Sequence, residues 1–209
     1  MYSKNSFSNV EQDSEHEWKI INYYKDLFIN AKSIDEIKQL NTQFIKGEIY
    51  NTCYHYGPLN RESSRISKEL LEMNELGFIT TGSQPGQERV DCQQRGLVEG
   101  LIDKRVFEKF RRVMYNICDD IYIRKSDDTN MLNQLRYLGK EPPEWYWVTI
   151  DNGHPFTHTS HCDKPCQSFH RCKLYEQIKE KYFEIDIVDM KWGRANYIHK
   201  KVVEALCSL

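Results

Sequence analysis

The sequence predicts an α/β fold, with a mixed α+β arrangement as the alternative, because helical and strand patterns occupy different parts of the chain. Residues before Gly77 carry apolar side chains at the three- and four-residue spacing of amphipathic helices. After Gly77, strand-like segments alternate with helical ones, and one of them, WYWVTI, is apolar on both faces like an interior strand. Together these patterns predict a single three-layer-like domain, in which a helical N-terminal layer accompanies a mixed sheet.

Capping residues and glycine stops define the expected helices of the N-terminal layer. Ser33 followed by Glu36 is a capping-box pattern that begins a helix, and Gly47 can end it. Gly77 stands in the same position after a later helix. The expected helices cover residues 17–31, 33–47 and about 62–76, with a loop at 51–60.

The second half of the chain favours strands joined by shorter helices. Phe78 to Thr81 reads as a short strand that runs into a turn, and Asp103 can cap a helix. The expected strands cover residues 78–81, 94–102, 120–125, 146–150 and 184–188, and the expected helices begin near Asp103, Leu174 and Ala195.

The chain divides into a short arm and one domain. Residues 1–15 are polar with an acidic end, so we expect a disordered arm there. Residues 16–209 form the expected α/β domain, which includes a Cys- and His-rich loop at 151–172.

Composition gives little support to a nucleic-acid or membrane partner. The chain has 29 Lys and Arg against 31 Asp and Glu, a net charge of −2, which makes nucleic acid an unfavoured partner. No apolar run approaches the length of a membrane helix, so we expect no membrane contact. Seven cysteines, an odd number, without a secretory signal indicate reduced thiols and a cytoplasmic, intracellular protein, in a host cell if the chain is viral.

Three separated sequence blocks occur in a fixed order: GFITTGSQPG, QQRGLVEGL and VDMKWGR. With the leading segment AKSIDEIKQLNTQFIKGEI, they resemble a family that is catalogued only as a domain of unknown function, found mainly in actinomycete bacteria and with relatives in other organisms and viruses. The resemblance covers roughly residues 17–209 and implies one continuous fold. It implies no activity, cofactor or catalytic residue, and the insertion with Cys162 to Cys172 is not part of the family pattern.

The first candidate site is the turn that follows the strand 78–81. Its glycines allow close approach of a ligand, and its hydroxyls and amides could bind a phosphate, carboxylate or sugar. The alternative is a structural turn whose hydroxyls bond to the local backbone. The candidate ligand-binding residues of this turn are Thr81, Gly82, Ser83, Gln84 and Gly86.

The second candidate follows the strand 184–188. If the strands 78–81, 146–150 and 184–188 run parallel, the loops after them gather at one sheet edge, where open α/β folds bind ligands. Arg194 could grip an anion there, Trp192 could stack on it, and Asp189 could act as acid or base. The alternative is an Asp189–Arg194 ion pair that holds the loop, with the indole in the core.

A third block places Arg95 and Glu99 on one face of a strand, by alternation. Glu99 is a candidate acid or base with Arg95 as its charge partner, and a structural salt bridge is the alternative. His199, beside two lysines on the last helix, is expected to be exposed.

The fourth candidate is a metal site in the Cys- and His-rich loop. Cys162, Cys166, His170 and Cys172 are soft or borderline ligands in the number that zinc requires. Their spacing differs from that of common zinc knuckles, and a loop of reduced cysteines is the alternative.

These candidates favour a domain that binds a small anionic ligand, such as a nucleotide or phosphorylated metabolite, at a sheet edge. If the domain is an enzyme, hydrolysis or transfer at that ligand is the expected class. Two other functions remain open. One is a non-catalytic interaction protein whose aromatic loops, 51–60 and 142–156, contact a protein partner. The other is a nucleic-acid accessory protein that uses the basic segment 104–112.

Overall fold

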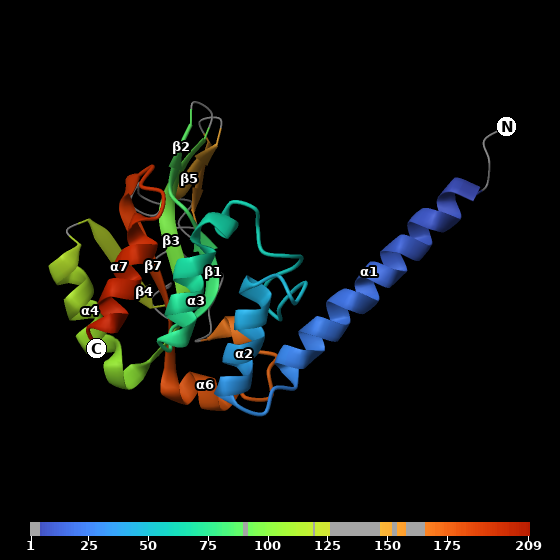
Figure 1. Ribbon diagram of the computed structural model, residues 1–209, viewed down its shortest axis with the longest axis horizontal. Helices are drawn as coiled ribbons and strands as arrows, with labels where there is room; N and C mark the ends of the chain where they lie inside the picture. Colours follow the sequence, from blue (N-terminus) through green and yellow to red (C-terminus); the bar gives the residue numbers. More distant parts are fainter. Residues whose placement is uncertain (1–4, 90–91, 119, 126–146, 152–153, 158–165) are drawn as a thin grey trace, which may run out of the picture.

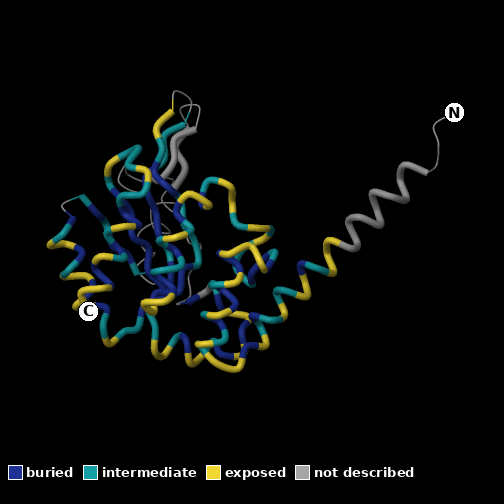
Figure 2. The backbone as a smooth tube through the Cα atoms, in the orientation of Figure 1, coloured by how far each residue is buried: buried dark blue, intermediate teal, exposed yellow. Residues whose placement is uncertain are grey.

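The computed structural model describes residues 5–89, 92–118, 120–125, 147–151, 154–157 and 166–209. A sheet forms its centre, with helices packed around it, and one long helix projects from the body (Figure 1). Buried residues concentrate in the sheet and in the helices beside it (Figure 2). The predicted fold class, helices and a sheet with a helical N-terminal layer, is therefore confirmed.

The long strand β3 (Cys92–Asp103) organises the sheet. Its second half lies between β1 (Ile79–Gln84) and β7 (Tyr182–Trp192), and β4 (Ile121–Lys125) pairs with the outer edge of β7. Its first residues pair with two short strands, and a third lies beyond one of them, so that the sheet extends as a ribbon. These are β2 (Gln87–Glu88), β5 (Trp147–Asp151) and, on the far side of β5, β6 (His154–Thr157).

Every strand pairing among the described residues is antiparallel, where we expected a mixed sheet. The short link from β2 to β3 is long enough for an antiparallel turn, whereas parallel neighbours need a crossover of a dozen or more residues. Because β1, β5 and β7 each pair antiparallel with β3, they run in the same direction without being neighbours. These strands therefore meet the condition of a common direction that the sheet-edge hypothesis set, but β3 lies between β1 and β7.

One face of the sheet is covered by α3 (Ser67–Glu75), α4 (Lys104–Ile117) and α7 (Tyr197–Cys207). Helix α7 packs on β3 and β7 and has α3 and α4 beside it. Asp103 caps α4, as predicted, since its carboxylate accepts from the Arg105 N–H at 2.8 Å. Close contact between α7 and β3 requires Gly96, because a Cβ there would lie 2.8 Å from the Ile198 side chain.

The remaining helices pack beside β1 and the β7 end of the sheet. Helix α2 (Ile34–Ile45) begins at Ser33, whose hydroxyl accepts from the Glu36 N–H as the capping box requires. A short helix η1 (Ser63–Ile66) precedes α3, and η4 (Gln167–Phe169) precedes α6 (Tyr175–Lys181). Helix α1 spans Asn5–Ile29 and so includes most of residues 1–15; that these residues are disordered stays a prediction.

Candidate functional site

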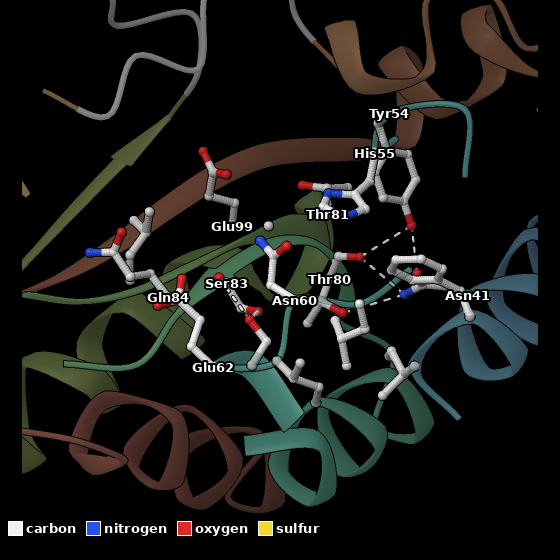
Figure 3. Close-up of a pocket in the computed structure, with 17 residues that line it drawn as sticks. Asn41, Tyr54, His55, Asn60, Glu62, Thr80, Thr81, Ser83, Gln84 and Glu99 are labelled. Carbon is white, nitrogen blue, oxygen red and sulfur yellow. Dashed lines mark hydrogen bonds between the residues drawn. The ribbon is translucent and has the colours of Figure 1, made fainter. Parts of the chain in front are cut away.

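A pocket of about 340 Å³ opens beside β1. Its walls come from α2, from the segment between α2 and η1, from β1 and from β3 (Figure 3). Ligand pockets in proteins begin near this volume. Five residues selected from the sequence line it together: Thr81, Gly82, Ser83, Gln84 and Glu99.

Hydrogen bonds to Asn41, a buried residue of α2, hold two walls of the pocket together. The Asn41 amide donates to the Thr80 carbonyl at 3.0 Å and to the Asn74 side chain at 3.1 Å. Its oxygen accepts from the Tyr54 hydroxyl, so the loop wall is tied to the β1 wall through one side chain. A buried amide with satisfied hydrogen bonds on several sides gives a rigid wall.

The loop wall carries Tyr54 and His55 in a turn that Thr52 organises. The Thr52 hydroxyl accepts from the backbone N–H groups of both residues, at 3.2 and 2.8 Å. This side-chain-to-backbone pattern is typical of turns that begin at Ser or Thr. Figure 3 shows Tyr54 and His55 across the pocket from Gln84 and Glu99.

A bulge in β1 makes room for the carboxylate of Glu99. Gly82 lies opposite Glu99 in the pairing, directly after the register shift between Thr80 and Gly82. A Cβ at position 82 would lie 2.0 Å from Glu99 Oε2. Glycine is therefore required at this position for the Glu99 side chain to occupy the pocket wall as it does.

Two more carboxylates, Glu184 and Asp186, lie on the same face of the sheet as Glu99. Asp186 is directly opposite Glu99, and Glu184 is two residues away along β7. Asp186 is fully buried and paired with the buried Arg124 of β4. The sheet face beside the pocket thus carries a buried group of acidic side chains.

Glu184 is 4% exposed, and its Oε2 has no hydrogen-bond partner among the described residues. Its pKa is raised to about 7, chiefly by burial and also by the nearby charges of Glu99 and Asp186, although hydrogen bonds from Ser168 act in the opposite direction. A carboxyl group with a pKa near neutrality, next to a pocket, is typical of functional sites.

Asp189 and Arg194 lie on the opposite face of the sheet, outside the pocket lining. The Asp189 Cβ packs beside Gly96 and Ile198, which is the face that α7 covers. Arg194 donates through Nε to Asp189 Oδ2 at 2.8 Å, and a second bond joins its Nη2 to Oδ1. Its guanidinium lies over the Tyr197 ring, 3.8 Å from the centroid. The contacts of this pair match the ion-pair alternative for the loop.

The other predicted ligand-binding residues also lie outside the pocket lining. Arg95 is buried and stacks on Trp192, with 4.2 Å between the guanidinium carbon and the ring centroid. Gly86 donates its N–H to the Ala195 carbonyl, and a Cβ there would lie 2.7 Å from the Arg194 carbonyl oxygen. The glycine therefore serves close backbone packing.

The proposed zinc ligands are not brought together in the described residues. Cys162 lies outside the described residues, His170 is exposed, and the Cys166 thiol donates to the Tyr182 carbonyl. Cys172 instead lies beside Cys53. Within the described part of the chain, no three His, Cys, Asp or Glu side chains are arranged to hold a metal ion.

The order of the sequence blocks points to a single family, and comparison with family models agrees. A model of a domain of unknown function, DUF6919, matches residues 24–209. The chain belongs to the DUF6919 family. A search of the curated proteins finds no match to this DUF6919 domain. Among its described helices, none is long and apolar enough to span a membrane.

Several residues of the DUF6919 pocket had no signal in the sequence. Asn41 and Tyr54 look like ordinary helix and loop residues, and they meet β1 only through tertiary packing. Glu184, beside the pocket, alternates with Asp186 in a part of the strand whose other face is apolar, and buried carboxylates of this kind could have been noticed as exceptions. His199, expected to be exposed, is fully buried against the sheet, because α7 turns this side chain inward with Ile198.

Proposed function

We propose that the domain binds a small polar molecule in the pocket beside β1, with Glu99 as the charged group that contacts it. The observation that carries the proposal is the convergence of Thr81, Ser83, Gln84 and Glu99 on one enclosed space. Their neighbours across the pocket add the phenol of Tyr54, giving donors and acceptors on both sides. A few convergent polar groups within a partly apolar wall are typical of ligand sites.

The charge of the lining favours a neutral or positively charged ligand. Two of the described lining residues, Glu62 and Glu99, are carboxylates, and none is Lys or Arg. Behind the wall, Glu184 adds to this potential where it is ionised, whereas Asp186 is paired with Arg124. The sequence suggested an anion held by Arg194, but that side chain is engaged by Asp189 on the other face. A hydroxyl- or amine-bearing molecule without net negative charge therefore suits the pocket better than a nucleotide.

Of the two carboxylates considered as acid or base, only Glu99 lines the pocket. Glu184, with its raised pKa, is a buried neighbour on the adjacent strand. This arrangement supports Glu99 as the group that would exchange a proton with a bound ligand.

The test is thermal unfolding against sugars, amino sugars, amines, nucleosides and their phosphorylated counterparts. A ligand at about a hundred times its dissociation constant stabilises by about 2.7 kcal/mol, which raises the melting temperature by about 5–10 °C for a chain of this size. We expect neutral or amine ligands to shift the wild type. Glu99→Gln and Gly82→Ala should abolish the shift, and Glu75→Gln, an exposed change on α3, should retain it. A shift only with phosphorylated compounds, or one equal in all variants, would contradict the proposal.

The interaction-protein function remains a prediction. Tyr56, in the first of its two aromatic loops, is 64% exposed and bonds to Lys25 of α1. For the second loop, residues 142–146 and 152–153 lie outside the described residues.

A further inference from the structure

Two thiols from distant parts of the chain meet behind the loop wall of the pocket. Cys53 Sγ lies 3.7 Å from Cys172 Sγ, and Cys53 also lies 3.6 Å from the Ser168 carbonyl. Cys53 belongs to the segment between α2 and η1, and Cys172 to the turn between η4 and α6. We propose that Cys53 and Cys172 form a reversible disulfide by exchange with a low-molecular-weight disulfide of the glutathione type.

Of the two partners, Cys172 is held by backbone hydrogen bonds on both sides, and Cys53 lies in the Thr52 turn of the loop wall. The backbone of Cys172 accepts from Tyr175 N–H at 3.0 Å and donates to the Phe169 carbonyl at 2.8 Å, and the adjacent Lys173 is bonded to Ile29 of α1. Cys53 lies in a segment without helix or strand. A disulfide needs a sulfur–sulfur distance of about 2.05 Å, so the observed separation of 3.7 Å between the two sulfurs must shorten by less than half.

Aromatic side chains next to the cysteines pack the two segments that carry them against each other. The Tyr54 ring, directly after Cys53, packs edge-on against Phe169, with centroids 5.2 Å apart. The same ring contacts Phe28 on its other side, at 5.9 Å. The cysteines therefore approach each other as part of a packed contact between two chain segments.

The exchange balances without any group beyond the two thiols and the small disulfide. The hydrogen bond between the two thiols raises the pKa of Cys53 and lowers the pKa of Cys172, but half-buried Cys53 is the more exposed sulfur and the one that a small disulfide can reach. Cys53 gives up its proton and attacks one sulfur of the small disulfide, and the other half leaves as a thiolate that takes up a proton. The Cys172 thiolate then attacks Cys53 Sγ in the mixed disulfide and releases the second small thiol. One disulfide is reduced, one is formed, and the two protons of the cysteines end on the released thiols.

A zinc site is the competing explanation for two close thiols. Two thiolates on a tetrahedral zinc, each bound at about 2.3 Å, would lie about 3.8 Å apart, near the observed separation. Zinc takes four ligands, however, and no third His, Cys, Asp or Glu joins this pair within the residues that the structure describes. A disulfide needs only the two sulfurs that are present.

The disulfide would fasten the pocket wall. Tyr54 and His55 follow Cys53 directly and line the pocket, and the crosslink would join them to the turn before α6. Closing a loop of more than a hundred residues is expected to raise the melting temperature of the oxidised protein by about 10–20 °C.

The experiment uses the full chain, reduced, freed of excess reductant and exposed to oxidised glutathione at about pH 8, where thiolates form. Remaining thiols are alkylated, and the protein is digested and mapped by mass spectrometry. We expect a Cys53–Cys172 crosslink that dithiothreitol removes. Cys172→Ser should instead leave glutathione attached to Cys53, and Cys207→Ser, which changes an exposed cysteine, should crosslink like the wild type.

Cooperative unfolding of each reduced variant, compared with the reduced wild type, shows that the serine changes leave the fold intact. Three results would overturn the proposal. They are a wild type that keeps glutathione on Cys53 without a crosslink, a crosslink from either cysteine to a different one, and reduced protein that carries one zinc per chain, which Cys172→Ser loses and Cys207→Ser keeps.

Discussion

Replacing Glu184 with glutamine tests the buried acidic group beside the pocket. The pKa of Glu184 is raised from its usual 4.5 to about 7, chiefly by burial. A tenfold change in proton affinity is worth about 1.36 kcal/mol, so the ionised side chain lowers the free energy of unfolding by about 3 kcal/mol at full ionisation. Below pH 4.5 the folded and unfolded chains both hold the proton, and this cost vanishes.

The sign follows from proton linkage. Between pH 4.5 and about 7 the folded chain binds more protons at Glu184 than the unfolded chain does, so this residue makes stability fall as pH rises. Glutamine resembles the protonated side chain and cannot ionise. We therefore expect Glu184→Gln to gain stability relative to the wild type as pH rises from about 5 to 8, by about 3 kcal/mol in total.

Urea unfolding of both proteins at several pH values between about 5 and 8 measures this difference directly, because the linear extrapolation gives a free energy at each pH. Any pH-independent cost of the amide changes the free energy of unfolding of Glu184→Gln equally at every pH, so it leaves the pH dependence of the difference unchanged. Glu75→Gln, on the exposed side of α3, is the matched control and should show no such slope. A constant difference between Glu184→Gln and wild type over this range would refute a buried, titrating Glu184.

Three further changes test other parts of the structure. Burial lowers the pKa of His199 to about 4, so the folded chain resists protonation, and the wild type should lose about 3 kcal/mol of stability as pH falls from 6.5 to 4. His199→Leu should abolish this loss, as measured by urea unfolding. Arg194→Ala should lower the free energy of unfolding by about 3 kcal/mol, since it leaves the buried carboxylate of Asp189 unpaired, and adding Asp189→Asn should restore part of the loss. Gly100→Ala should destabilise by about 2 kcal/mol, because its Cβ would lie 2.4 Å from a backbone oxygen. The Cβ of Gly82→Ala would meet the flexible end of the Glu99 side chain, so this change should affect ligand binding more than the melting temperature.

Local patterns were sufficient for most of the elements. The capping box at Ser33 and the cap at Asp103 predicted the starts of two helices, because a cap depends on residues three or fewer positions away. The pairing of the strands depends on contacts between distant segments, and alternation within β3 carries no information about its neighbours. The predicted mixed sheet was wrong for this reason, although the common direction of β1 and β7 was right.

Residues of the candidate site that lie in one continuous segment were predictable from the sequence. Residues that join the site from distant segments were not. Thr81, Ser83 and Gln84 were selected as a polar turn after a short strand; the strand β1 in fact continues through Gln84, but the residues do line the pocket. Glu99 was selected by alternation along its strand. Asn41 joins the site from a helix forty residues earlier through bonds to the Thr80 backbone. Such a contact exists only after α2 packs against β1, so no pattern in either segment could reveal it.

The buried charges on the pocket side of β3 argue that this face is kept for something other than stability. An apolar residue at position 184 would avoid the cost of about 3 kcal/mol that ionised Glu184 imposes near neutral pH. The Asp189–Arg194 pair on the opposite face has no such cost in evidence, since each charge has its partner and holds the loop before α7. The Asp186–Arg124 pair on the pocket face is likewise neutralised within the fold. Glu184 differs from both pairs, because it is a buried carboxyl group near its titration point on the strand that pairs with Glu99.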